Sequence, residues 1–285
     1  MIGQRAAWLV ALLLAVAVAM VVLASYRLRQ KDAALSARLE AIRSRDGERE
    51  IACDTVRAGQ PLVLLALGQS NAGNHGAAPP TALEPVTLVA DDRCVVADDP
   101  LPGATGTGAS IWRRLPDTLA RQGVARPVVL SVLAVDATSI DDWTRERSPL
   151  RRSLEAKLAI MRRLGLKPDL VLWQQGEADA LAGSGAQAYA EGLVALVSAL
   201  TAAGVDAPVL LARSTTCHPP PNAAIRTAIE SALADNPRFR LGPDTDALQG
   251  SRFRHDGCHF SADGLDAAAK MWAERIKAQL PPNAL

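Results

Sequence analysis

Short, unbroken runs of apolar residues alternate with amphipathic stretches along most of this chain. The clearest run is 62–67, which ends at Gly68 and is followed at once by Gln69, Ser70 and Asn71. An apolar run of this length that stops at glycine is typical of a strand buried on both faces in a parallel sheet. Comparable runs predict further strands at 128–135, 170–173, 209–212 and 239–241, with a weaker run at 86–90.

Amphipathic stretches between these runs predict helices. Ile111, Leu115 and Leu119 lie four residues apart and form one apolar face, although Pro116 falls within the stretch. The same kind of spacing predicts helices around 154–161, 189–200, 225–233 and 262–280. Because strand and helix alternate from residue 62 onward, we expect one α/β domain. It should contain a doubly wound parallel sheet of about five strands with helices on both faces.

The N-terminal segment has a different pattern, because residues 7–25 carry no charge and are rich in Leu, Val and Ala. Their length is close to that needed to cross a bilayer and exceeds the apolar core of most signal peptides. We therefore expect an uncleaved membrane anchor, with a cleaved secretion signal as the alternative. Leu35, Leu39 and Ile42 then share one face of a second helix. This organisation gives an anchor at 1–31, a juxtamembrane helix and polar linker at 32–50, and the α/β domain at 51–285.

The composition argues against several classes of function. The net charge is +1 and no basic block is present, so the sequence predicts no nucleic-acid partner. None of the four cysteines lies in a C-x-x-C pair, which argues against a zinc ribbon or a thioredoxin-type site. An even number of cysteines allows two disulfides, with free core thiols as the alternative.

Two observations disagree on the side of the membrane that the domain occupies. Arg27, Arg29 and Lys31 follow the uncharged segment, whereas only Arg5 precedes it. The positive-inside rule would then keep the domain in the cytoplasm. The cysteines instead indicate an oxidising compartment. We give the cysteines more weight because of their positions, which are described below.

Polar residues gather at the ends of the predicted strands. Besides the one at Ser70, such clusters occupy 136–143, 173–179 and, before the last helix, 256–261. In a doubly wound sheet these segments converge on one edge. A serine becomes a nucleophile when a base takes its proton, and that base is commonly a histidine oriented by a carboxylate. His259, with Asp256 three residues before it, fits this role.

The combination of motifs resembles the SGNH hydrolases, and more narrowly their sialate O-acetylesterase and acetylxylan esterase branch. The residues that carry the resemblance are Gly68-Gln69-Ser70-Asn71, Trp173-x-Gln175-Gly176-Glu177-x-Asp179 and Asp256-x-x-His259. Thr138-Ser139-Ile140-x-x-Trp143 fits the same branch, although Asp136-Ala137 stands where two glycines are usual. The resemblance covers residues 61–273 and implies a flavodoxin-like, SGNH-type sheet.

The resemblance also implies roles for individual residues. Ser70 would be the nucleophile, His259 the general base and Asp256 the acid that orients it. The oxyanion hole would combine the N–H groups of Ser70 and Gly108, with Gly106 as the alternative. The Gln175 amide would replace the asparagine of the wider family. The residues expected to bind substrate or organise these loops are Gln69, Asn71, Ser139 and Glu177. No metal or other cofactor is required.

The cysteines can be placed relative to these motifs. Cys258 lies inside the Asp-x-x-His segment, and a bridge from Cys217 would hold the base in place. Cys53 and Cys94 are the remaining pair. We hypothesise both disulfides, and they favour a membrane-anchored domain in the periplasm or another extracytoplasmic compartment.

The leading hypothesis is a serine esterase that removes short acyl groups, acetyl above all, from a carbohydrate. The same triad would also suit a lipid or other small ester, or an acetyltransferase. A catalytically silent carbohydrate-binding protein of the envelope is the alternative from another class. It would hold its ligand through Trp143 and acidic residues, but the complete triad argues against it. The expected partners are an O-acylated carbohydrate and the membrane.

Overall fold

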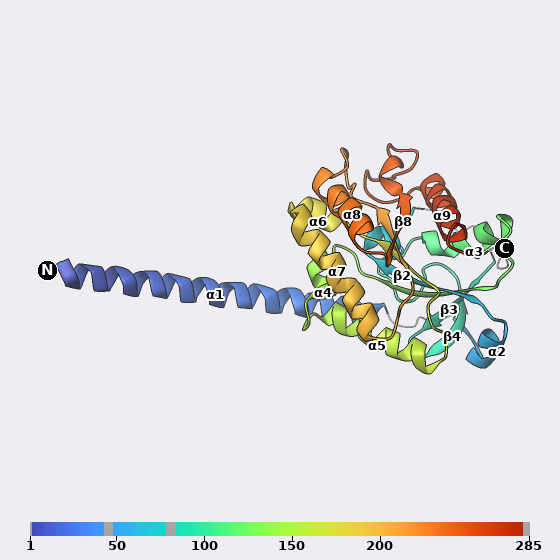
Figure 1. Cartoon of the computed structure of the whole chain (residues 1–285), viewed down its shortest axis with the longest axis horizontal. Coiled ribbons are helices and arrows are strands. Elements are labelled where there is room, and N and C mark those ends of the chain that lie inside the picture. The colour runs from blue at the N-terminus through green and yellow to red at the C-terminus, as the bar shows by residue number, and fades with distance from the viewer. Residues whose placement is uncertain (1, 43–47, 78–83, 282–285) are drawn as a thin grey trace.

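The computed structural model describes residues 2–42, 48–77 and 84–281. A single helix, α1 (Ile2–Ala41), projects from an α/β domain that contains the rest of the described residues (Figure 1). Between Ala11 and Ala41 this helix is long and apolar enough to cross a membrane, a property that signal sequences share. The helix continues without a break through residues 31 and 32, where we expected the anchor to end and the juxtamembrane segment to begin. Part of the predicted polar linker, residues 43–47, lies outside the described residues.

The domain is built around an eight-stranded sheet with the order β1-β4-β3-β5-β2-β6-β7-β8. Neighbouring strands are parallel from β3 across to β8, whereas β4 is antiparallel to both of its neighbours. The strands are β1 (Arg49–Ile51), β2 (Leu62–Gly68), β3 (Val86–Ala90), β4 (Arg93–Ala97), β5 (Val128–Ala134), β6 (Leu170–Gln174), β7 (Val209–Arg213) and β8 (Phe239–Asp244). The apolar run at 62–67 forms β2, which lies inside the sheet and is fully buried.

The prediction of about five strands was too low. The weak run at 86–90 is a strand, and β4 returns beside it through a two-residue turn at Asp91 and Asp92. Two acidic residues between apolar runs are a hairpin signal, because such turns place residues at positive φ, as Asp91 is here at 48°. Strand β1 has only three residues, which are too few to show a recognisable alternation of apolar and polar positions.

Helices cover both faces of the sheet, as the alternation of elements predicted. The 3₁₀ turns are η1 (Ser70–Ala72) and η2 (Thr245–Ala247); the remaining helices are α2 (Cys53–Ala58), α3 (Ile111–Arg121), α4 (Ile140–Thr144), α5 (Pro149–Arg163), α6 (Glu177–Ala182), α7 (Ala186–Ala202), α8 (Ala223–Asp235) and α9 (Ala262–Lys277). Odd-numbered residues of β2, such as Leu65, pack with α5, α7 and α8. Even-numbered residues, such as Leu64, pack with α3 and α9. Burial on both faces explains why β2 has no polar position.

The second half of α1 belongs to the core of the domain. Leu35 and Ile42 are buried in the same cluster as Leu154 and Leu158 of α5. These contacts come from the apolar face that the spacing of Leu35, Leu39 and Ile42 predicted. The helix therefore joins an exposed apolar half to a half that is packed on the domain.

Candidate active site

Register places the predicted motifs at one edge of the sheet. Gly68, at the end of β2, pairs with Ala134 of β5 on one side and with Gln174 of β6 on the other. The segments that follow these three strands therefore begin side by side. Gly68 has a φ of 155°, and a Cβ there would lie 2.0 Å from the Gln174 carbonyl oxygen. Only glycine allows the chain to turn here into η1, where Ser70 lies.

Hydrogen bonds fix both residues that flank Ser70. The Gln69 Oε1 atom accepts from the Ala178 N–H at 3.0 Å. The Asn71 Nδ2 atom donates to Glu177 Oε1 at 2.8 Å and to the Cys258 carbonyl at 3.2 Å. Ser70 itself is 6% exposed, and its N–H has no partner among the described residues. Its backbone is held while its N–H is available to a ligand.

Asp256 and His259 form a hydrogen-bonded pair. Asp256 Oδ2 lies 2.7 Å from His259 Nδ1, while Asp256 Oδ1 accepts the N–H groups of Cys258 and His259 at 2.9 and 2.7 Å. Partial burial alone would raise the pKa of Asp256, but these hydrogen bonds outweigh it and hold the pKa well below its ordinary value. The carboxylate is therefore ionised, and it orients the ring through Nδ1 rather than Nε2.

The Asn71 bond to the Cys258 carbonyl brings the His259 loop against the turn that carries Ser70. Within the described part of the chain, no hydrogen bond joins Ser70 Oγ to the His259 ring. Such bonds are often long in ligand-free enzymes and tighten when substrate binds. The buried Arg254 guanidinium also donates to the Cys258 carbonyl, and its other donors reach the carbonyls of Thr245 and Leu248. The loop is thus held from two sides.

The structure adds a residue that the sequence did not single out. The His75 ring stacks on the His259 ring, with centroids 5.2 Å apart and planes inclined by 23°. One His75 nitrogen lies 3.2 Å from Thr105 Oγ1. Burial lowers the pKa of His75, and the neighbouring His259 lowers it further, so the neutral form of the ring is favoured. No spacing in the sequence links positions 75 and 259, which is why this contact was missed.

Two of the predicted oxyanion donors are wrong. The Gly108 N–H donates to the Asn74 carbonyl at 2.8 Å, so it is already used. The Gln175 side chain is fully buried, and its Nε2 atom donates to Asp179 Oδ2 at 2.6 Å and to the Thr138 carbonyl at 2.9 Å. A longer contact of 3.3 Å reaches Gln69 Oε1. Gln175 therefore connects the loops beneath the site and does not face a substrate.

Glu177 is also an internal residue. It is fully buried, and its Oε1 atom accepts from Asn71 and from Ser214 Oγ at 2.6 Å. Its Oε2 atom is buried without a hydrogen-bond partner among the described residues. Burial raises the pKa of Glu177 to about 7, although the bonds from Ser214 and Asn71 lower it. The expectation that Glu177 binds substrate hydroxyls is wrong, whereas the expectation that it organises the loop agrees with these contacts.

The other expected substrate-binding side chains also bond within the protein. Gln69 and Asn71 are 2% and 3% exposed, and their bonds run to α6 and to the His259 loop. Ser139 forms a capping box with Asp142 at the start of α4. The fully buried Trp143 packs edge-on against Trp173 and is a core residue, not a sugar platform.

Both hypothesised cysteine pairs are bonded in the structure, and the described chain has no free cysteine. The Cys217–Cys258 bridge ties the loop after β7 to the segment that carries His259. The Cys53–Cys94 bridge ties α2 to β4, away from Ser70.

Among the residues that the structure describes, one group has the spacing of metal ligands. His255, Asp256 and His259 offer ligand atoms within 4.8 Å of one another. Asp256 Oδ2 and His259 Nδ1 already bond to each other, so the group is organised as an acid–base pair.

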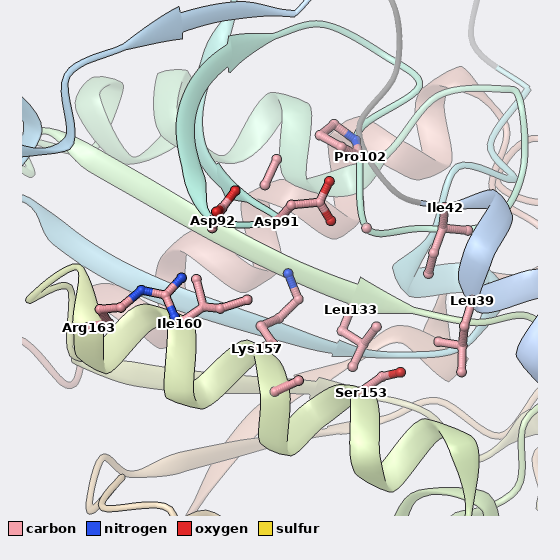
Figure 2. A pocket seen from close by; sticks show the side chains of 13 residues that line it. Leu39, Ile42, Asp91, Asp92, Pro102, Leu133, Ser153, Lys157, Ile160 and Arg163 are labelled. Atoms are coloured by element: carbon pink, nitrogen blue, oxygen red, sulfur yellow. The ribbon is translucent and has the colours of Figure 1, made fainter.

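A cavity of about 500 Å³ lies apart from this site, between the end of α1, α5 and the β3–β4 turn. Figure 2 shows the Lys157 side chain projecting into it toward Asp91. Burial lowers the pKa of Lys157 to about 8, and the nearby Asp91 carboxylate opposes that change. None of Ser70, Asp256 and His259 lines this cavity, so it does not define the active site.

A serine and an Asp–His pair thus lie beside the carboxyl edge of a mostly parallel sheet. A family model described as a carbohydrate esterase, sialic acid-specific acetylesterase, matches residues 61–278. The chain belongs to this family and is a carboxylic ester hydrolase.

Solved structures share the fold. A protein from Arabidopsis thaliana superposes with a TM-score of 0.64 at 17% identity, over 78% of this chain and 100% of that one. A carbohydrate acetylesterase from Xanthomonas citri superposes with a TM-score of 0.52 at 15% identity, over 75% of this chain and 55% of that one. No curated protein sequence matches this chain.

Proposed function

We propose that this protein hydrolyses short-chain esters, acetyl esters above all, on a carbohydrate through a Ser70–His259–Asp256 triad. The observation that carries the proposal is the Asp256–His259 pair, which the Asn71–Cys258 contact holds against the turn that begins at Ser70. Membership of a carbohydrate esterase family supports the substrate class.

In the proposed reaction the Ser70 Oγ attacks the ester carbonyl carbon while His259 Nε2 takes the hydroxyl proton. Asp256 stabilises the imidazolium that forms, and the Ser70 N–H stabilises the negative charge on the carbonyl oxygen. The sugar hydroxyl then leaves with the proton from His259, and the acyl group remains on Ser70. Water, deprotonated by the same histidine, releases the acid and restores the serine.

The neutral His75 ring supports this cycle. A cationic neighbour stacked on His259 would disfavour the imidazolium, whereas a neutral ring does not. The small exposed fraction of Ser70 favours short acyl groups, because a long chain would need an apolar groove beside the nucleophile.

The proposal includes attachment to a membrane through the apolar half of α1, with the domain in an oxidising compartment. The length and composition of α1 and the two disulfides support this location.

The test uses Ser70→Ala and His259→Ala, measured by hydrolysis of p-nitrophenyl acetate. Each should lower the rate by at least about 10³-fold while near-UV circular dichroism stays unchanged. Asp54→Asn, an exposed change on α2, is the matched control and should keep full activity. Full activity in either triad variant would refute the assignment. A fluorophosphonate probe should label the wild type and not Ser70→Ala, which would exclude a catalytically silent binding protein.

A further inference from the structure

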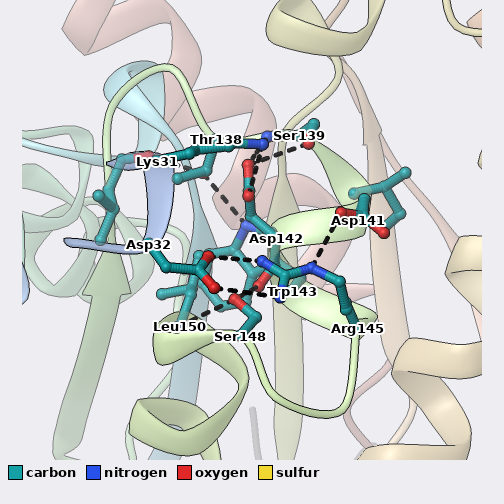
Figure 3. A network of polar contacts seen from close by, with 12 residues as sticks. Lys31, Asp32, Thr138, Ser139, Asp141, Asp142, Trp143, Arg145, Ser148 and Leu150 are labelled. Carbon is teal, nitrogen blue, oxygen red and sulfur yellow. Dashed lines mark hydrogen bonds and ion pairs between the residues drawn. The ribbon is translucent and has the colours of Figure 1, made fainter. Parts of the chain in front are cut away.

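The helix α1 joins the domain at the edge of the sheet that carries the candidate site. Lys31 Nζ lies 2.6 Å from Asp142 Oδ1, and Arg145 Nη2 donates to Asp32 Oδ1 at 2.6 Å (Figure 3). Asp142 and Arg145 belong to the segment that follows the carboxyl end of β5. Asp142 Oδ2 in turn accepts from both the N–H and the Oγ of Ser139 at 2.9 Å. The helix is thus tied to α4, in the segment that follows the end of β5 next to Ser70.

From the N-terminal to the C-terminal end of α1, successive contacts with the domain lie closer to the sheet. Arg38 donates to the carbonyl of Asp136, two residues beyond the end of β5. The Ile42 carbonyl accepts from the Gly103 N–H at 2.7 Å, and the Gly103 carbonyl accepts from Ala134, the last residue of β5. α1 therefore runs antiparallel to β5, and its apolar half extends beyond the carboxyl edge of the sheet. Figure 1 agrees, because α4 and α6 lie on the side from which α1 approaches.

The candidate nucleophile lies on the same edge. Because Gly68 pairs with Ala134, Ser70 and Asp136 each lie two residues beyond the paired ends of neighbouring strands. Neighbouring strands are about 4.8 Å apart. The edge that contains Ser70 thus faces the membrane that α1 would cross.

The distance to that membrane is fixed by the helix. The uncharged part of α1 ends at Tyr26, and Arg38, which bonds at the level of Ser70, is twelve residues later. At about 1.5 Å per residue this is roughly 18 Å, of which the headgroup layer takes up about 5–8 Å. No glycine or proline interrupts 26–41, and Leu35 is fully buried in the domain. The edge of the sheet that carries Ser70 is therefore held about 10 Å from the lipid headgroups by a continuous helix.

We infer that the substrate is an acylated sugar carried on a lipid of the same membrane. The inference rests on the proposed esterase function and on the proposed anchor. Soluble esters have the easiest access to a site that faces away from the bilayer. A site that faces the headgroups at short range instead meets esters that diffuse in the membrane plane, where the effective concentration is high.

The experiment uses the full chain in lipid vesicles with three substrates. The first is an O-acetylated monosaccharide linked to a diacylglycerol tail in the same vesicles. The second is the same acetylated sugar as a soluble methyl glycoside, and the third is p-nitrophenyl acetate. The variant carries seven helix-forming residues inserted after Arg29, which lift the domain by about 10 Å with little rotation. The matched control carries the same insertion after Gly3, before the uncharged segment.

The ratio of the lipid-linked rate to the soluble rate should fall by about fivefold or more in the Arg29 insertion. It should stay within about twofold of the wild type in the Gly3 control. The inference is overturned if the ratio is unchanged after lifting, if only the soluble sugar is cleaved, or if α1 is removed from the mature chain. If neither sugar nor p-nitrophenyl acetate is cleaved by any version, the esterase function itself fails.

Discussion

Replacing the buried Glu177 with glutamine should change how stability depends on pH. In the folded protein burial raises the pKa of Glu177 to about 7, whereas in the unfolded chain the carboxyl titrates near 4.5. Below pH 4.5 the group is protonated in both states and its contribution to stability is fully present. As the pH rises toward 7 the unfolded chain releases the proton first, so the wild type loses stability across this window.

The expected size follows from the distance between the two pKa values. It corresponds to roughly 3 kcal/mol of unfolding free energy lost between pH 4.5 and pH 7. Glutamine cannot ionise, and its Oε1 still accepts from Asn71 and Ser214. The variant should therefore lack this loss and gain stability relative to the wild type as the pH rises.

Urea unfolding of the full chain in detergent, followed by tryptophan fluorescence, measures this difference at pH 5, 6, 7 and 8. Other titrating groups, such as Asp99 with its pKa raised to about 6 by burial, are common to both proteins and cancel in the comparison. A difference between variant and wild type that is constant over this range would show that Glu177 is ionised in the folded state, and would refute the reasoning.

Three further predictions concern the surroundings of the triad and the anchor. His75→Ala removes the ring stacked on His259 and should lower kcat for p-nitrophenyl acetate by roughly tenfold with KM little changed; an unchanged kcat would show that the stacking has no role. Lys31→Met leaves Asp142 Oδ1 without its partner and should cost about 1–3 kcal/mol in urea unfolding, whereas Arg29→Met should cost less than about 0.5 kcal/mol. The double change Cys217→Ser and Cys258→Ser frees the His259 loop and should lower kcat more than removal of the Cys53–Cys94 bridge; equal effects would contradict a positioning role.

Local patterns in the sequence predicted the parts of the site that lie close together along the chain. The turn after β2 follows from an apolar run that ends at Gly68, and the Asp256–His259 pair follows from a spacing of three residues. In both cases the residues that make the feature are close neighbours in the sequence. The apolar face of the second half of α1 was predicted for the same reason, because Leu35, Leu39 and Ile42 repeat at helical spacing.

The predictions that failed depend on partners from distant segments. The Gln175 side-chain amide donates to the Thr138 carbonyl and to Asp179, and the Gly108 N–H donates to the Asn74 carbonyl. Thr138 and Asn74 lie far from these donors in the sequence, so the residues around Gln175 and Gly108 do not reveal the bonds. The stacking of His75 on His259 joins residues at opposite ends of the domain. The short strands β1 and β4, the outer two on one side of the sheet, are held by pairing with neighbours rather than by a pattern of their own.

The packing of α1 on the domain determines where the folding unit begins. Leu35 and Ile42 fill space beside α5, and the ion pairs of Lys31 and Asp32 lie one turn earlier. A shortened protein that starts at residue 51 would expose the apolar residues that α1 covers, so it should aggregate. One that starts at Arg27 would keep these contacts and lose only the apolar half of the helix. The soluble enzyme suited to crystallisation is therefore the longer of the two.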